Sequence, residues 1–114
     1  MAAATSGCGE QLIATTLAQT VGEAILKDGN PAFHLQALMT DHFLNSDLLD
    51  DTAVRMGGVM VAFYDGDSVD LNMAFTTDSM IVGLMSTTQK KAKVRISRNS
   101  SNSKLAIEGF IVKL

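Results

Sequence analysis

The chain has 114 residues, of which 46% are hydrophobic and 18% are charged. This length and balance predict one globular domain and exclude an intrinsically disordered chain. The single cysteine excludes an internal disulfide, and no run approaches the roughly 18–20 consecutive apolar residues of a membrane span. The start of the chain lacks the basic and apolar regions of a secretory signal, so we expect a cytoplasmic (intracellular) protein or one within an assembled particle.

The net charge of −3 hides a strong asymmetry along the chain. Residues 1–89 contain two bases and eleven acids, a net charge of −9, whereas residues 90–114 contain seven bases and one acid, a net charge of +6. Such asymmetry is typical of proteins with electrostatic partners. Three kinds of partner fit it: nucleic acid, an acidic protein, or the acidic part of another copy of this chain.

The N-terminal part of the chain predicts a loose end followed by a helix. Residues 1–8 are rich in Ala, Ser, Thr and Gly, and we expect a flexible arm there, followed by a single domain over 9–114. From 10 to about 27, apolar residues recur at helical spacing. Gly29 is placed to end that helix.

A second helix is expected over about 31–45. Asn30 and Pro31 fit its N-cap and its first position. The pattern is apolar on two sides, with Phe33 and Leu44 on the side opposite the main face. A helix with two apolar faces needs two partners, for example the sheet and another helix or subunit.

The remainder of the chain has the pattern of strands. A short turn or helix is expected first, over 45–55, before a continuous apolar run at 59–64 that is typical of a buried strand. Asp-Gly-Asp at 65–67 indicates a hairpin turn into an alternating strand at 68–75. Another apolar run follows at 79–86. Helices first and strands afterwards predict an α+β fold, with two N-terminal helices and a mainly antiparallel sheet of about five strands.

The two last strands are expected to form a basic ribbon. Alternation places Lys91, Lys93 and Arg95 on one face and the apolar Val94 and Ile96 on the other. We therefore expect the cations to line an outward, solvated stripe, with the apolar residues facing the core.

The pairing of this ribbon follows from its polar tip at 98–103. Pairing Ile96 with Leu105 across that tip would set Lys93 opposite Glu108, a favourable cross-strand pair. The apolar phase slips at Gly109, which predicts a β-bulge there.

No catalytic, metal or cofactor site is expected from these residues. His34 and His42, eight positions apart, would lie roughly 12 Å apart along a helix, too far to share a metal easily. Residues 65–70 resemble a calcium loop only at their start and lack its terminal Glu. Cys8 stands between glycines without an identifiable partner for nucleophilic chemistry.

Our first hypothesis is a non-enzymatic structural protein that assembles as a homo-oligomer or as a small component of a larger particle, such as a viral one. A solvated stripe that protects an edge hairpin from aggregation explains the same charges without a partner. The alternative function is a regulatory module or inhibitor that docks the ribbon on nucleic acid or an acidic protein, and a small enzyme with an unrecognised site is the third hypothesis. The candidate contact residues are Lys91, Lys93, Arg95, Arg98 and Lys104 as the bases, Asp47, Asp50 and Asp51 as the acids, and Phe33 and Leu44 as the apolar contacts.

Overall fold

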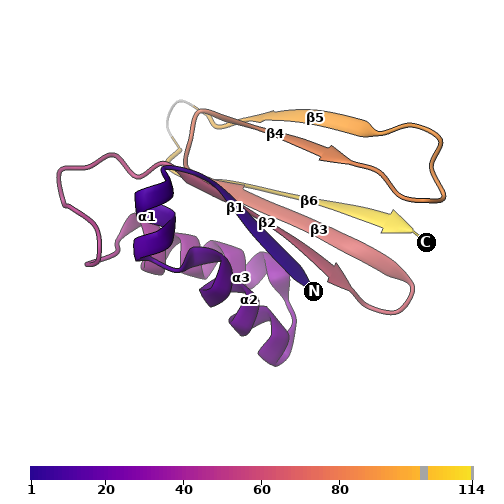
Figure 1. Ribbon diagram of the computed structural model, residues 1–114, viewed down its shortest axis with the longest axis horizontal. Helices are drawn as coiled ribbons and strands as arrows, with labels where there is room; N and C mark the ends of the chain where they lie inside the picture. The colour runs from indigo at the N-terminus through magenta and orange to yellow at the C-terminus, as the bar shows by residue number, and fades with distance from the viewer. Residues whose placement is uncertain (101–102, 114) are drawn as a thin grey trace.

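The computed structural model describes residues 1–100 and 103–113. They form the expected α+β fold, in which every strand pair is antiparallel. A four-stranded sheet of order β1-β2-β3-β6 lies between a layer of helices and a two-stranded ribbon, β4-β5 (Figure 1). In chain order the elements are β1 (Ala2–Gly7), α1 (Gly9–Ala14), α2 (Leu17–Asp28), α3 (Pro31–Leu38), the π-helix η1 (Met39–Leu44), β2 (Gly57–Tyr64), β3 (Ser68–Phe75), β4 (Ser79–Leu84), β5 (Lys93–Arg98) and β6 (Ala106–Lys113).

The larger core lies between the helices and the sheet. Val59 and Val61 of β2, with Ala74 of β3, supply its sheet side. The helices supply the fully buried Leu17, Val21, Ile25, Leu35, Met39 and Phe43. Within each helical segment these residues recur every four positions, so each segment turns one apolar face onto the sheet.

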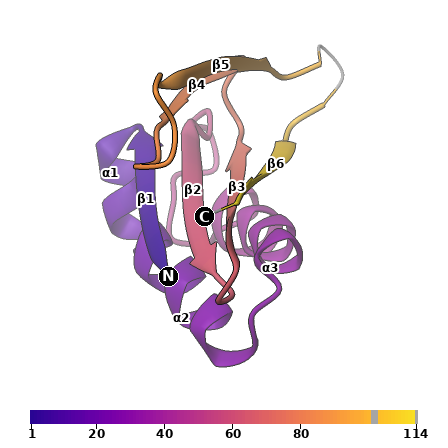
Figure 2. The same ribbon diagram turned by 90° about the vertical axis from the view of Figure 1, so that its right-hand side faces the viewer.

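A second, smaller core lies between the sheet and the ribbon. Met73 and Phe75 of β3 pack there with Val82 of β4, and Met60 of β2 joins them. Figure 2 shows the helices and the ribbon on different sides of the sheet. The apolar run at 59–64 is continuous because alternate residues of β2 face the two different cores.

Residues 1–8 differ from the flexible arm that their composition predicts. Ala2–Gly7 form strand β1, which pairs with β2 along its whole length, from Ala2 opposite Ala62 to Gly7 opposite Gly57. The strand is held by backbone hydrogen bonds and by Ala3, which packs against the larger core. This segment is therefore the edge strand of the sheet rather than a loose end.

The helix expected over 10–27 is divided in two. Thr16 stands in the left-handed region, with φ 45° and ψ 45°, between α1 and α2. The buried Thr15 hydroxyl donates to Gln11 O at 2.8 Å and completes the last turn of α1. Helical periodicity continues across the break, which explains why the sequence predicts a single helix.

The second helix closely follows its prediction. Helical structure runs from Pro31 through α3 and η1 to Leu44, and Gly29 ends the preceding helix with its N–H donating to Ile25 O at 2.7 Å. Asn30 and Pro31 occupy the N-cap and the first position of α3, as predicted, with Asn30 in the left-handed region and without a side-chain capping hydrogen bond.

The segments after the second helix follow the prediction. Residues 45–55 form turns, one of the two alternatives expected for them. The expected hairpin at 65–67 is confirmed, because Asp65 Oδ1 accepts from the N–H groups of Asp67 and Ser68, each at 2.9 Å. Gly66 supplies the positive φ of 109° in that turn.

The pairing predicted for the two last strands is wrong. β5 pairs with β4, and β6 instead joins the central sheet beside β3. The β3–β6 register runs unbroken from Ser68–Lys113 to Phe75–Ala106, so Gly109 lies in a regular ladder without a bulge. The apolar residues of β6 change from one face of the strand to the other along its length. Ile107 packs against the larger core beside the helices, whereas Phe110 packs against the smaller core beneath the ribbon. The predicted tip at 98–103 includes residues 101–102, outside the described residues.

Among the described residues, no helix combines the length and the hydrophobicity needed to span a membrane.

Candidate functional site

The β4-β5 ribbon carries the charged segment, and its register decides which side chains face outward. Val82 is buried under the ribbon, so its cross-strand partner Arg95 shares the inner face. Lys93, opposite Leu84, follows on the same inner face. The alternation predicted from sequence is therefore present within β5, but Lys93 and Arg95 lie on the face turned toward the protein's own sheet, and Lys91 lies before the strand.

The outer face of this ribbon is apolar. Ile81 lies opposite Ile96, and Val94 lies opposite Gly83. Ile81, Val94 and Ile96 are 66%, 70% and 55% exposed, respectively, although the sequence pattern predicts that Val94 and Ile96 face the core. We call these three residues the outer ribbon face. Three adjacent branched side chains left in water form a patch of the kind that marks interaction sites.

Arg95 is partly neutralised within its own chain. Its Nε lies 3.2 Å from Glu108 Oε2, and its guanidinium lies 5.0 Å from the centre of the Phe110 ring. The buried Ser97 hydroxyl donates to the same Glu108 carboxylate. Arg95 thus fastens β5 to β6 and is a poor candidate for binding a partner.

The other predicted cations remain available. Lys90 and Lys91 lie in the exposed β4–β5 connection, and Lys93 and Arg98 lie at the two ends of β5. None of the four forms an ion pair within residues 1–100 and 103–113. Lys90 and Lys91 lie beyond one end of the outer ribbon face, Arg98 lies on that face at its other end, opposite Ser79, and Lys93 lies on the inner face.

The predicted acidic acceptors lie in the loop 45–56, which we call the acidic loop. Gln11 holds this loop by donating Nε2 to Val54 O and accepting from the Met56 N–H at Oε1, both at 2.8 Å. The Thr76 hydroxyl donates to Arg55 O at 2.8 Å. These three hydrogen bonds, made by two side chains, fix residues 54–56 at the end of the loop.

The exposed side chains of the acidic loop are both charged and apolar. Asp47, Asp50 and Asp51 are exposed together with Leu48 and Val54, whose side chains are 62% and 75% exposed. The Thr52 backbone N–H, which donates to Asp50 Oδ1 at 2.9 Å, holds the pKa of Asp50 below its usual value. Asp50 therefore keeps its negative charge under mildly acidic conditions.

A cleft of about 950 Å³ lies beside this loop. Leu44, Asp51 and Lys104 all line it, so the structure brings together three candidates from different parts of the sequence. Arg55 also lines it, with Nη1 buried and lacking a hydrogen-bond partner among the described residues. Phe33 is 61% exposed on α3 and lines a separate, smaller hollow.

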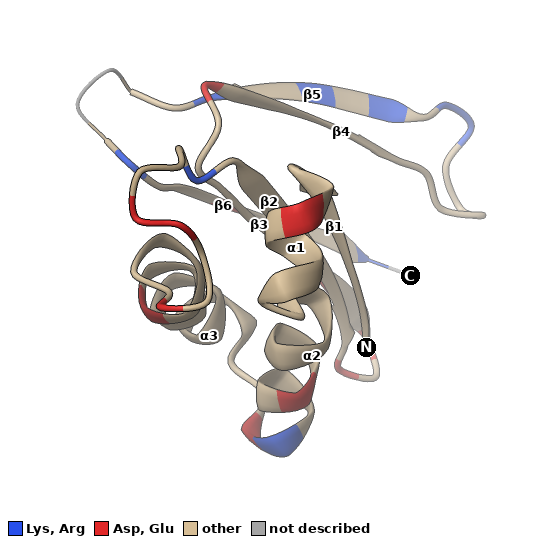
Figure 3. Ribbon diagram, turned by 60° about the vertical axis from the view of Figure 1, so that its left-hand side comes forward, with Lys and Arg blue, Asp and Glu red and all other residues tan. Residues whose placement is uncertain are grey.

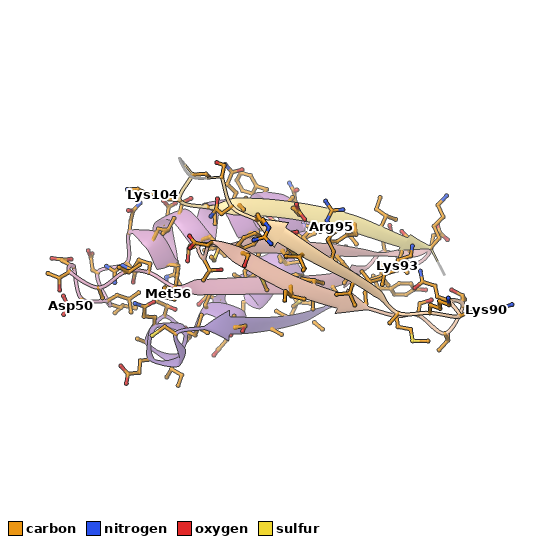
Figure 4. The ribbon with its side chains drawn as sticks, turned by 90° about the horizontal axis from the view of Figure 1, so that it is seen from above. Asp50, Met56, Lys90, Lys93, Arg95 and Lys104 are labelled. Carbon is orange, nitrogen blue, oxygen red and sulfur yellow. The ribbon has the colours of Figure 1, made fainter. Side chains whose placement is uncertain are left out.

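The acidic loop and the tip of the ribbon lie at opposite ends of the molecule. Asp50 and Lys90 mark the two ends in Figure 4, along a longest dimension of 46 Å. Figure 3 shows bases on β5 and the connection before it, and acids on α1, on the far end of α2 and in the acidic loop. One copy therefore cannot bring its own ribbon tip to its own acidic loop.

The histidines and the cysteine lack the arrangement of a reactive centre. His34 is bonded to Asp28, and His42 Nε2 to the carbonyl oxygen of Thr15, so each histidine joins neighbouring helical segments. Cys8 is a half-buried free thiol. Within the part of the chain that the structure describes, no three His, Cys, Asp or Glu side chains are grouped as metal ligands.

Sequence reasoning missed the exposed apolar residues Ile81, Leu48 and Val54 as candidate contact residues. Ile81 stands in an apolar run that is indistinguishable from a buried strand, and only the ribbon register places it outside. Leu48 and Val54 do carry a signal, since both are apolar residues within a turn-rich acidic segment. Compared with models of known protein families, the chain matches none.

Proposed function

We propose that this protein is a non-enzymatic assembly component whose copies join head to tail, ribbon to acidic loop. The observation that carries the proposal is the exposed apolar outer ribbon face, flanked at its two ends by Lys90, Lys91 and Arg98, which form no ion pair among the described residues. The acidic loop offers the complement, with exposed apolar side chains among carboxylates.

Two physical contributions support this contact. Burial of the branched side chains of the outer ribbon face stabilises association by about 25 cal/mol for each Å² of apolar surface removed from water. Opposite charges around the apolar centre steer the two surfaces together and fix their register. Since the paired surfaces differ, the contact is heterologous and builds rings or filaments. Membership of a larger particle and an intracellular location remain part of this proposal.

Sedimentation velocity over a series of protein and salt concentrations tests the proposal. We expect concentration-dependent association that weakens from 50 mM to 500 mM salt, because screening removes the electrostatic contribution. Ile96→Gln should weaken association about tenfold, whereas Ile111→Gln, at a residue 70% exposed on β6, should leave it unchanged. A strict monomer at high protein concentration and low salt would refute the proposal.

The second candidate is a regulatory module that docks on nucleic acid or an acidic protein. The exposed Lys90, Lys91 and Arg98 favour it, because phosphate contacts need no special geometry. A gel shift with mixed DNA and RNA separates the two functions. Nucleic-acid binding would depend on Lys90 and Lys91 and be insensitive to Ile96→Gln, whereas self-assembly would depend on Ile96.

A further inference from the structure

The ribbon and the sheet are in close contact along only part of their length. Met73, Phe75 and Val82 are buried between the two layers near the β3–β4 turn. Farther along, Leu71 and Leu84 remain half-exposed. Figure 1 shows the two layers separating toward the end that carries the β4–β5 connection.

Two adjoining cavities occupy that separation. One, of about 500 Å³, lies between β3 and β6 below and the end of β4 above, and is lined by Leu71, Leu84 and Val112. The other, of about 450 Å³, is lined by Phe110, Lys93 and again Leu84. We call the two together the interlayer slot. Each lies in the volume range of small-molecule sites, roughly 300–1,000 Å³.

The cations of the slot differ in their availability. Arg95 is neutralised by Glu108 and lies over Phe110. Lys93 lines the same cavity and has no ion pair within the described residues. The slot is therefore lined mostly by apolar side chains, with Ser86 and Thr87 at one end, and has one positive charge without an ion pair among the described residues. This combination is complementary to an apolar chain ending in an anion.

We infer that the interlayer slot binds a free long-chain carboxylate, with its alkyl chain against Leu71, Leu84 and Val112 and its carboxylate on Lys93 Nζ. The alkyl chain completes the apolar contacts that the separated layers leave unmade. The carboxylate supplies the charge-assisted hydrogen bond that Lys93 lacks. This site adjoins the outer ribbon face at Val94, which also lines the second cavity, but the side chains of Lys93 and Val94 point to opposite sides of β5, so the slot and the outer face present different side chains.

Isothermal titration calorimetry with monomeric decanoate tests the inference at protein concentrations below any self-association. We expect one saturable site per chain, with affinity rising roughly two- to fourfold for each methylene from octanoate to dodecanoate. Lys93→Gln should weaken decanoate binding about tenfold. Arg98→Gln, on the same strand but on the outer face, should leave it unchanged.

Two further measurements keep the inference falsifiable. Decanol, with the same chain but no charge, should bind the wild-type protein about tenfold more weakly than decanoate. Methyl NMR shifts on adding decanoate should concentrate at Leu71, Leu84 and Val112. Four results would overturn the inference. These are no saturable heat, equal decanoate affinity of wild type and Lys93→Gln, shifts confined to other methyl groups, and binding only to decanoate micelles. Self-association lost by Ile96→Gln but not by Lys93→Gln keeps this test distinct from that of the proposed function.

Discussion

Arg95 on β5 and Glu108 on β6 form an ion pair between the ribbon and the central sheet, with Nε and Oε2 3.2 Å apart. The sequence predicts that Glu108 lies opposite Lys93 within a hairpin. In the structure Glu108 instead pairs with Arg95, and this ion pair joins the ribbon to the sheet. This exchange turns the cationic face of β5 inward. It thereby exposes the apolar face on which the proposed assembly depends.

The Arg95–Glu108 ion pair should stabilise the packing of the ribbon on the sheet by a small, measurable amount. The Arg95 and Glu108 side chains are 57% and 29% exposed, so solvent screens the pair. A double-mutant cycle with Arg95→Gln and Glu108→Gln should give a coupling free energy of about 0.5–1 kcal/mol in urea unfolding. Lys93→Gln should show no coupling with Glu108→Gln. Equal couplings for both bases would contradict the observed pairing.

Thr16 is a strained residue whose replacement should stabilise the protein. A β-branched side chain in the left-handed region raises the free energy of the folded state by about 1–2 kcal/mol. Replacement by glycine removes this strain, but glycine also increases the backbone entropy of the unfolded chain, which offsets part of the stabilisation. Thr16→Gly should therefore raise the free energy of unfolding by about 0.5–1 kcal/mol. Thr20→Gly, within α2, should lower it by about 1 kcal/mol. Destabilisation by both substitutions would show that Thr16 is not strained.

Gly57 is required for close packing between β2 and the helices. A Cβ at this position would lie 2.7 Å from Phe43 Cζ and 3.0 Å from Leu12 Cδ2. Gly57→Ala should thus lower the free energy of unfolding by about 1–3 kcal/mol in thermal or urea unfolding. Gly83→Ala, whose Cβ would approach Lys93 O only to 4.0 Å, is the matched control and should have little effect. A neutral Gly57→Ala would mean that Phe43 is free to move.

The β2–β3 turn should make stability depend on pH. The Ser68 backbone N–H, followed by that of Asp67, holds the pKa of Asp65 below its usual value of 3.8. A folded-state pKa below the unfolded one adds stability that is fully present above pH 3.8 and is lost as pH falls through the lowered pKa. Asp65→Asn should consequently lower the Tm at pH 7, and its difference from wild type should vanish in strong acid. A difference that stays constant with pH would contradict this origin.

The sequence predicts the elements of this fold better than their partners. Val59 and Val61 have strand character from local chemistry alone, and the turn at Asp65 follows from Asp-Gly-Asp. Which strands pair depends on distant packing, and that is where the prediction failed. Arg95 and Ile96 lie on opposite faces of β5, as expected. Alternation separates the two faces of a strand, but it does not identify the face that packs against the rest of the protein.

The candidate site, like the fold, was predictable from the sequence only in part. The acids Asp47, Asp50 and Asp51 are exposed together, as their local composition predicts. The contact face of the ribbon was not predictable, because Ile81 and Ile96 are far apart in the chain and become neighbours only through the β4–β5 register.

Mixing two complementary variants tests head-to-tail assembly most directly. One carries Val94→Gln and Ile96→Gln and keeps its acidic loop; the other carries Asp47→Asn, Asp50→Asn and Asp51→Asn and keeps its ribbon. By sedimentation velocity, each alone should be a monomer at concentrations where the wild type associates, and an equimolar mixture should form a one-to-one dimer that grows no further. A mixture that stays monomeric, or a ribbon variant that still assembles alone, would contradict the account.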